Sequence, residues 1–203
     1  MPAQRYHHGN LRQALVQAGL ELARAGGPQA VVLRAVSREA GVSHNAAYRH
    51  FSSHDALIAA VAERCMENLG TLMLSQLSAV DESRPVPRAR ARLDALGRAY
   101  VEFARAEPGW FTTAFTATHD APVPTSELND GGPHPFRLLT GCLDELAETG
   151  AIPPQRRPGA EYAAWSAVHG LSHLLIEGPL RTLPEEDVRL ALNVTLDVVS
   201  RGL

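Results

Sequence analysis

Apolar residues recur every three or four positions along most of the 203-residue chain, and no useful stretch alternates apolar and polar residues. A spacing of about 3.6 residues places apolar side chains on one face of an α-helix, whereas a half-buried strand needs alternation. The sequence therefore predicts an all-α fold of about nine helices.

Glycine, proline and capping residues set the expected helix ends. Ser52 and Asp55 have the spacing of a capping box, so a long fourth helix is expected to begin there. Residues 119–135 are rich in proline and glycine and are expected to form a loop. The other helices are expected near 11–25, 33–40, 44–50, 93–107, 110–115, 136–146, 160–177 and 184–201.

The fourth helix and the distribution of charge both divide the chain. Running to about residue 78, this helix is roughly 35 Å long, more than a three-helix head needs. Residues 1–64 carry seven arginines against four acidic residues, whereas the remainder carries 12 against 18. A basic head on an acidic body fits a head that meets a polyanion. We expect a head domain over 1–54 and a body domain over 55–203.

The stretch from Leu33 to Phe51, LRAVSREAGVSHNAAYRHF, has the pattern of a helix-turn-helix. Gly41 can adopt a left-handed turn without a Cβ penalty. Val36 and Val42 sit where two crossing helices need apolar contacts. Ser43 can cap the second helix and leave its first N–H groups toward a phosphate.

This geometry points His44, Asn45, Tyr48 and Arg49 outward, toward a major groove. Asparagine can pair with adenine, arginine with guanine or a phosphate, and histidine with base acceptors. Tyrosine offers a hydroxyl to the DNA backbone. The alternative is a helical hairpin in which Tyr48 and Phe51 only pack.

Three short motifs make the chain resemble the TetR (tetracycline-repressor-like) family of transcriptional regulators. These are Ala40–Ser43, Tyr48–Phe51 and Asp55–Leu57, at the spacing of the family's head. The resemblance covers residues 10–58, about a quarter of the chain. It implies that 1–54 binds DNA and that 55–203 binds an effector and forms a dimer.

Departures from the family pattern concern the contacts with phosphates. Val32 replaces a capping threonine, and His54 replaces a lysine that commonly meets a phosphate in the family. DNA affinity is therefore expected to rise as His54 protonates below about pH 6.5. Arg5 is expected to reach the DNA backbone or minor groove, unless the N-terminus is disordered. Arg34 and Arg38 are phosphate candidates, with a solvated helix face as the alternative.

The last two helices are expected to form the homodimer interface that the resemblance implies. Residues 160–177 are apolar around most of the helix, which requires cover on several sides. A dimer of this kind reads an inverted-repeat operator on double-stranded DNA. The pattern Trp165, His169, Gly170 also resembles the family's WHG subtype. In the ninth helix the expected apolar stripe is Val188, Leu192, Thr195 and Val199, with Leu196 beside it.

Aromatic residues concentrate between the head and the expected interface. They predict a largely apolar pocket with a few polar groups, for a small-molecule effector of unknown identity. The alternative for each residue is ordinary core packing. The expected pocket residues are Tyr100, Phe103, Trp110, Phe111, Phe115, Phe136, Tyr162, Trp165 and His169.

Metal and cofactor sites are not expected. His169 and His173 have a metal-compatible i, i+4 spacing, and His119 and His134 lie on or beside the expected loop, so a metal site stays open as an alternative. No cofactor motif is present.

Catalytic motifs are also missing, so an enzyme is not expected. The expected function is that of a repressor released from DNA by a small, largely apolar ligand, and the alternative is a ligand-independent or activating DNA-binding regulator. Cys65 and Cys142 are expected to be reduced core residues. The chain has neither a secretion signal nor a membrane-spanning run, so a cytoplasmic location is expected.

Overall fold

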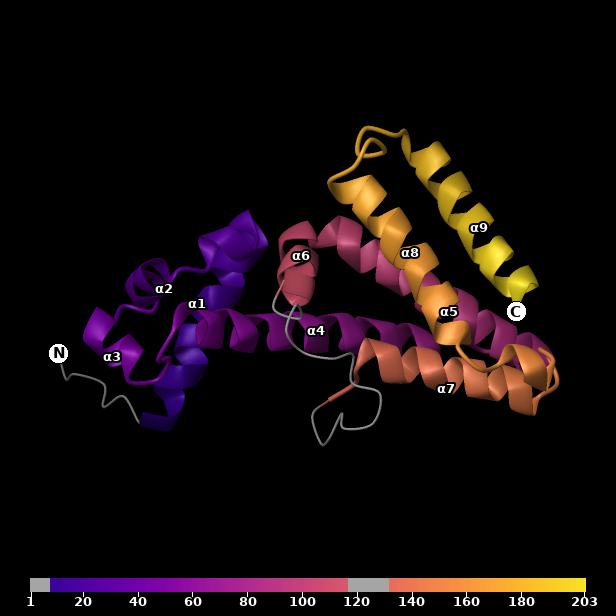
Figure 1. The fold of residues 1–203 in the computed structure, drawn as a ribbon, viewed down its shortest axis with the longest axis horizontal. Helices are drawn as coiled ribbons and strands as arrows, with labels where there is room; N and C mark the ends of the chain where they lie inside the picture. The colour runs from indigo at the N-terminus through magenta and orange to yellow at the C-terminus, as the bar shows by residue number, and fades with distance from the viewer. Residues whose placement is uncertain (1–7, 117–131) are drawn as a thin grey trace. The chain divides into compact units, whose positions relative to one another are not determined.

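The computed structural model describes residues 8–116 and 132–203, and the regular structure in these ranges is entirely helical (Figure 1). The predicted all-α fold is confirmed. The α-helices are α1 (His8–Gly26), α2 (Leu33–Glu39), α3 (His44–Tyr48), α4 (His54–Ser78), α5 (Pro85–Ala106), α6 (Pro108–Thr116), α7 (Pro135–Glu148), α8 (Ala160–Ile176) and α9 (Glu185–Gly202). Short 3-10 turns occupy Pro28–Ala30 and Pro154–Arg156.

Helix ends follow the local breakers, with two corrections. The cap of α4 is Ser53, not Ser52, because the Ser53 hydroxyl accepts the Ala56 N–H at 3.1 Å. Helix α5 begins at Pro85, whereas the sequence placed its start near residue 93. Proline is tolerated in a first helical turn because the N–H it lacks would have no intrahelical partner there.

The chain forms two compact units that divide within α4. The first unit contains the residues up to Met66 and also α6. Its core includes Leu15 of α1, Val36 of α2 and Phe51, together with Leu57 and Val61 of α4. The unit extends past the boundary expected at residue 54 because the first turns of α4 supply core side chains.

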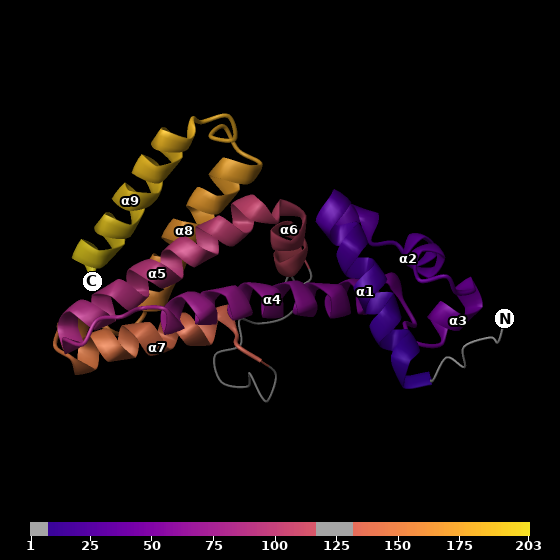
Figure 2. The ribbon, with the colours of Figure 1, turned by 180° about the vertical axis from the view of Figure 1, so that it is seen from behind.

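The second unit contains the rest of α4 together with α5, α7, α8 and α9. Helix α5 packs against α7, α8 and α9, and α8 packs against α9. Figure 2, turned by 180°, brings α5 in front of α8. Leu96 of α5 and Leu143 and Leu146 of α7 are buried in this unit.

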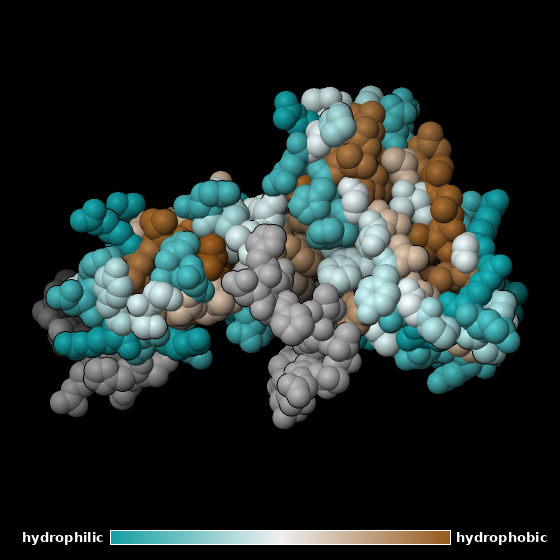
Figure 3. All heavy atoms as spheres, in the orientation of Figure 1, coloured by the Kyte–Doolittle hydropathy of each residue, from teal (hydrophilic) through white to brown (hydrophobic). Residues whose placement is uncertain are grey.

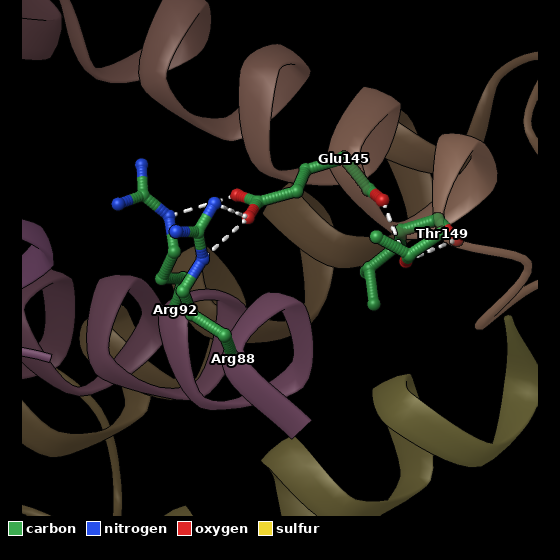
Figure 4. A network of polar contacts seen from close by, with 5 residues as sticks. Arg88, Arg92, Glu145 and Thr149 are labelled. Carbon is green, nitrogen blue, oxygen red and sulfur yellow. Dashed lines mark hydrogen bonds and ion pairs between the residues drawn. The ribbon is translucent and has the colours of Figure 1, made fainter. Parts of the chain in front are cut away.

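A polar network joins α5 to α7 at the surface of the second unit (Figure 4). Arg88 Nη2 and Arg92 Nε each lie 2.9 Å from a carboxylate oxygen of Glu145. The Thr149 hydroxyl donates to the Glu145 carbonyl at 2.7 Å. The Glu145 side chain is only 18% exposed, so these partly buried ion pairs help to fix how α5 and α7 align.

Within 8–116 and 132–203, no helix is long and apolar enough to cross a membrane.

Candidate nucleic-acid interface and internal aromatic cluster

The turn between α2 and α3 depends on the left-handed backbone of Gly41, whose φ is 67°. Its N–H donates to the Arg38 carbonyl at 3.1 Å, and the Val42 N–H donates to the Ser37 carbonyl at 2.9 Å. No atom lies within 4 Å of the position that a Cβ would occupy. Backbone conformation rather than space therefore favours glycine here.

Ser43 caps α3 as predicted, because its hydroxyl accepts the Ala46 N–H at 3.2 Å. Within the five-residue helix only Ala47 is buried, so α3 is held mainly by this one small side chain. Phe51, just after α3, is 2% exposed and belongs to the core of the first unit.

The outer face of α3 carries the four residues expected there: His44, Asn45, Tyr48 and Arg49 are all exposed. Tyr48 is 50% exposed, so it does not merely pack as Phe51 does. The His44 and Tyr48 rings meet edge to face, with centroids 4.7 Å apart. This contact restrains the Tyr48 ring on a short helix that has little other support.

The start of α2 lacks a side-chain cap, as its Val32 predicts. Arg34 and Arg38 are exposed on this helix. The Ser37 hydroxyl, buried inside the first unit, donates to the Leu33 carbonyl at 2.7 Å. Arg5 lies outside the described residues.

The His54 ring lies between the Val31 carbonyl and the Asp55 carboxylate. Nε2 lies 2.9 Å from the Val31 carbonyl oxygen, which can only accept, so Nε2 carries the hydrogen and donates. Nδ1 lies 3.6 Å from a carboxylate oxygen of Asp55. The imidazole thus ties the start of α4 to the segment before α2. Sequence reasoning missed this contact, because nothing local marks Val31 as a partner.

The expected pocket residues of α6 pack within the first unit. Phe111 is buried, and Trp110 and Phe115 pack against the core that α1 and α4 supply. The Trp110 indole N–H donates to the Leu20 carbonyl of α1 at 2.8 Å.

Two further contacts hold α6 against α1. The Arg24 guanidinium forms an ion pair with Glu107 and lies 5.1 Å from the centroid of the Trp110 ring. A Cβ at Gly109 would lie only 2.2 Å from the Ala23 carbonyl oxygen. The two backbones therefore approach more closely than any other residue type would permit.

The second unit holds a hydrogen-bonded aromatic cluster formed by Tyr100 of α5, Phe136 of α7, and Trp165 and His169 of α8. The Trp165 indole N–H donates to the Tyr100 hydroxyl oxygen at 3.1 Å. That hydroxyl lies 2.7 Å from His169 Nδ1. Phe136 meets the Trp165 ring edge to face, with centroids 5.8 Å apart. These four expected pocket residues do come together.

Burial shapes the titration of this cluster. Burial, with a smaller contribution from the charge of His173, lowers the pKa of His169 to about 4. Burial also raises the pKa of the Tyr100 hydroxyl. Both side chains are therefore neutral at pH 7.

Two other expected pocket residues differ in exposure. Phe103 is buried on α5. Tyr162 is 53% exposed on α8. Aromatic character alone does not show on which face of a helix a residue lies.

Metal-compatible residues do not gather in the described part of the chain, which holds no group of three or more histidine, cysteine or acidic side chains that could hold an ion. The His169 and His173 rings meet edge to face at 4.7 Å, and His173 Nδ1 lies 3.5 Å from Glu177. His134 caps α7, because its Nδ1 accepts the Phe136 N–H at 3.2 Å. His119 lies outside the described residues.

The exposed apolar face of α9 is not the one expected from the sequence. Val188, from the expected stripe, is 4% exposed and faces the unit's own core. Leu190, Val194 and Val198 are exposed instead, one helical turn apart. Apolar side chains also gather over α8 and α9 in Figure 3.

Comparison with known proteins gives consistent results over both units. Residues 15–61 match the family described as "Bacterial regulatory proteins, tetR family", and residues 93–199 match "Tetracyclin repressor-like, C-terminal domain". The HTH-type transcriptional regulator YobS of Bacillus subtilis (strain 168) is 24% identical over 195 residues, covering 96% of this chain and 93% of that protein.

Two solved structures illustrate the likeness of fold. A protein of unknown function from Rhodococcus sp. RHA1 has a TM-score of 0.77 and 30% identity, with 99% of each chain covered. The transcriptional regulator FadR from Bacillus subtilis, in complex with stearoyl-CoA, has a TM-score of 0.66 and 12% identity, with 94% of this chain and 98% of that chain covered.

Proposed function

Because the chain belongs to the TetR family of transcriptional regulators, we propose that it is a homodimeric repressor, released from an inverted-repeat operator by a small, largely apolar ligand. The family and the fold are those of DNA-binding regulators rather than of enzymes. Because its target is DNA, the protein would act in the cytoplasm. The Trp165, His169, Gly170 pattern makes membership of the WHG subtype part of the same proposal.

The observation that carries the proposal is the outer face of α3. A turn at Gly41 and a cap at Ser43 present a short helix whose exposed side chains are all able to bond to DNA. Asn45 and Arg49 have the chemistry to read adenine and guanine in a major groove. Tyr48 and Arg34 would bind phosphates, which position a protein on the duplex without reading sequence.

A small-molecule effector is supported by the aromatic cluster of the second unit. Phe136 and Trp165 supply apolar surface, while Tyr100 and His169 supply a few polar groups, as ligand sites generally do. The FadR complex with stearoyl-CoA is a case in which a protein of this fold binds an organic ligand. A ligand acts on DNA binding only through different affinities for the DNA-competent and the released states.

A homodimer is supported by the exposed apolar row of α9 and by Leu174 on α8. Two-fold symmetry would then place two α3 helices in successive major grooves, about 34–36 Å apart. An activating regulator, or one that needs no ligand, is the second candidate. A reporter gene placed downstream of the operator distinguishes a ligand-released repressor from the second candidate, because a repressor lowers expression of the reporter and its ligand restores it.

The proposal is tested by selecting binding sites from a pool of random duplexes at physiological salt. We expect an inverted repeat with half-sites about 10 base pairs apart, or a multiple of this, bound at least about a thousandfold more tightly than random duplex. Recovery of no inverted repeat, or equal affinity for random duplex, would overturn the proposal.

Matched variants connect the result to α3. Arg49→Ala should weaken operator binding and relax base preference, whereas Arg98→Ala removes the same charge from the exposed face of α5 and should change neither. Asn45→Ala should relax preference at one base pair in each half-site. Identical site preference for all three variants would refute these assignments.

A further inference from the structure

Helix α9 carries opposite charges at the two ends of its exposed apolar row, which consists of Leu190, Val194 and Val198. These three side chains are 60%, 53% and 63% exposed. Asp187 in the first turn of the helix and Arg201 in its last turn are exposed as well. At 3.6 residues per turn, the five side chains lie within an arc of about 80°. One face of α9 therefore has an acid at one end, an apolar centre and a base at the other end.

The spacing along this face is symmetric about Val194. Asp187 and Arg201 each lie seven positions from Val194, which is about 10 Å along the helix axis. Leu190 and Val198 each lie four positions from it. A rotation of 180° about an axis through Val194 exchanges the two charged ends, so the face is complementary to a second copy of itself. Closed dimers with two-fold symmetry use self-complementary surfaces of this kind.

Resting on the proposed function, we propose that two copies of this chain pair through antiparallel α9 helices centred on Val194, with Asp187 opposite the partner subunit's Arg201 at both ends. Leu190 then packs against the partner subunit's Val198. A crossing angle of about 20°, common for packed helices, keeps the charged ends within reach of each other.

The charges distinguish this arrangement from a parallel one. A parallel pair would place two aspartates together at one end and two arginines together at the other, which is unfavourable at both. Arg201 already donates from Nε to Asp197 Oδ1 at 2.9 Å in its own helix. A guanidinium has five N–H donors, so it can also bind a carboxylate of the second copy.

The apolar row and the charges have different roles in this pairing. Removing the row from water supplies most of the affinity, and any apolar partner surface would benefit from it. Ion pairs at the rim contribute less to affinity, but they oppose wrong alignments. Only a partner with the same spacing of acid, apolar row and base matches both ends. The face thus selects a second copy over an unrelated apolar surface.

Charge reversal in the full-length protein tests the pairing. Asp187→Arg and Arg201→Asp each create two repulsive pairs per dimer, so each should raise the Kd of the dimer at least about tenfold at low salt. The double variant exchanges the two charges and should recover most of the affinity. Arg189→Asp reverses an exposed charge on a different face of α9 and should leave the Kd unchanged.

Mixing the two single variants gives a second prediction. Asp187→Arg has arginine at both ends of the face, and Arg201→Asp has aspartate at both ends. Each resists pairing with itself, but together they should form a heterodimer about as tight as the wild-type dimer. Analytical ultracentrifugation measures these affinities at about 0.05 M and about 0.5 M salt, and the differences should shrink at the higher salt because the charges are screened.

Cysteine cross-linking determines the direction of the helices. Under mild oxidation, Val194→Cys should cross-link to itself, because this position lies on the two-fold axis. Leu190→Cys should not, because its two copies lie about 12 Å apart along the axis, too far for a disulfide. A mixture of Leu190→Cys and Val198→Cys should cross-link. The native Cys65 and Cys142 are buried and do not compete.

Three outcomes overturn the proposal: an unchanged Kd for both single charge reversals, a double variant as weak as the single ones, or self-cross-linking of Leu190→Cys. Operator binding is measured on the same samples. A wild-type protein that binds its operator as a monomer would count against the homodimer of the proposed function. A dimer that binds the inverted repeat but does not respond to charge reversal counts only against this inference.

Discussion

Single side chains at the two candidate sites differ in what surrounds them. On α3, the exposed residues contact little besides each other, so their replacement should disturb DNA binding more than folding. In the cluster of the second unit, Tyr100 and His169 contact each other inside the protein, so their replacement disturbs stability as well. This difference decides which measurement is informative at each site.

Tyr48→Ala should weaken operator binding by about 1–3 kcal/mol, because it removes both a hydroxyl and a ring from the outer face of α3. Tyr48→Phe keeps the ring that meets His44 and should lose less. Fluorescence anisotropy with the selected operator measures both affinities, and thermal unfolding checks that the fold is intact. Full affinity of Tyr48→Ala would remove this residue from the interface.

His169 should make the protein less stable as pH falls from about 6.5 toward 4. The pKa of His169 is lowered to about 4 in the folded protein, so in this range the unfolded chain binds more protons and the folded state loses stability. Between pH 7 and pH 5 the loss should be about 1–2 kcal/mol. Urea unfolding at the two pH values measures it. His169→Asn should reduce this dependence of stability on pH. If the variant loses as much stability as the wild type between the two pH values, another group is responsible.

At the scale of helices, local sequence signals predicted where helices end but not which of their faces pack against other helices. Helix ends at Gly26 and Gly150 and the turn at Gly41 were predictable, because breakers act through the backbone of their own segment. The inward face of α9 was not predictable, because α9 has more than one apolar stripe. Which stripe faces inward depends on the helices that α9 packs against. Likewise, no local signal shows that α6 packs on α1 of the first unit.

The exposed face of α3 was predictable for the same reason as its ends. The pattern of a turn, a cap and one small buried residue fixes which side chains point outward. The aromatic cluster was predictable only in part: residue type identified Tyr100, Phe136, Trp165 and His169, but also Trp110 of the first unit and the exposed Tyr162. The hydrogen-bonded chain itself joins residues 65 and 69 positions apart, which no sequence spacing reveals.

Gly109→Ala should destabilise the first unit by about 2 kcal/mol or more, because the added methyl group would lie 2.2 Å from one α1 carbonyl oxygen and the backbone must move. Gly141→Ala is the matched control. It lies in the exposed interior of α7 with nothing within 4 Å of its Cβ position, and should stabilise by up to about 1 kcal/mol. Urea unfolding compares the two, and equal effects would show that α6 does not depend on this close approach.

For the molecule as a whole, the question is what covers the apolar face of α8 and α9. Leu190, Val194 and Val198 form a row along α9, and Leu174 and Tyr162 are exposed on α8. A gathering of large exposed apolar side chains of this kind is typical of an interaction site. In the proposed function a second copy covers this face, because an inverted repeat needs two heads related by two-fold symmetry.

Val194→Glu should convert the proposed dimer to a monomer. Val194 is 53% exposed in the single chain, so a carboxylate there stays in water and costs the monomer little, whereas in a dimer it would be buried against apolar side chains without a partner. Leu74→Glu makes the same kind of change at an exposed position of α4 and should leave the dimer intact.

Analytical ultracentrifugation gives the mass of each variant, and fluorescence anisotropy compares its affinity for the full inverted repeat with its affinity for a half-site. The monomeric variant should bind both duplexes with the same low affinity, since each head then binds alone. A Val194→Glu dimer with full operator affinity would show that the two copies meet elsewhere, and the exposed row on α9 would then need a different partner.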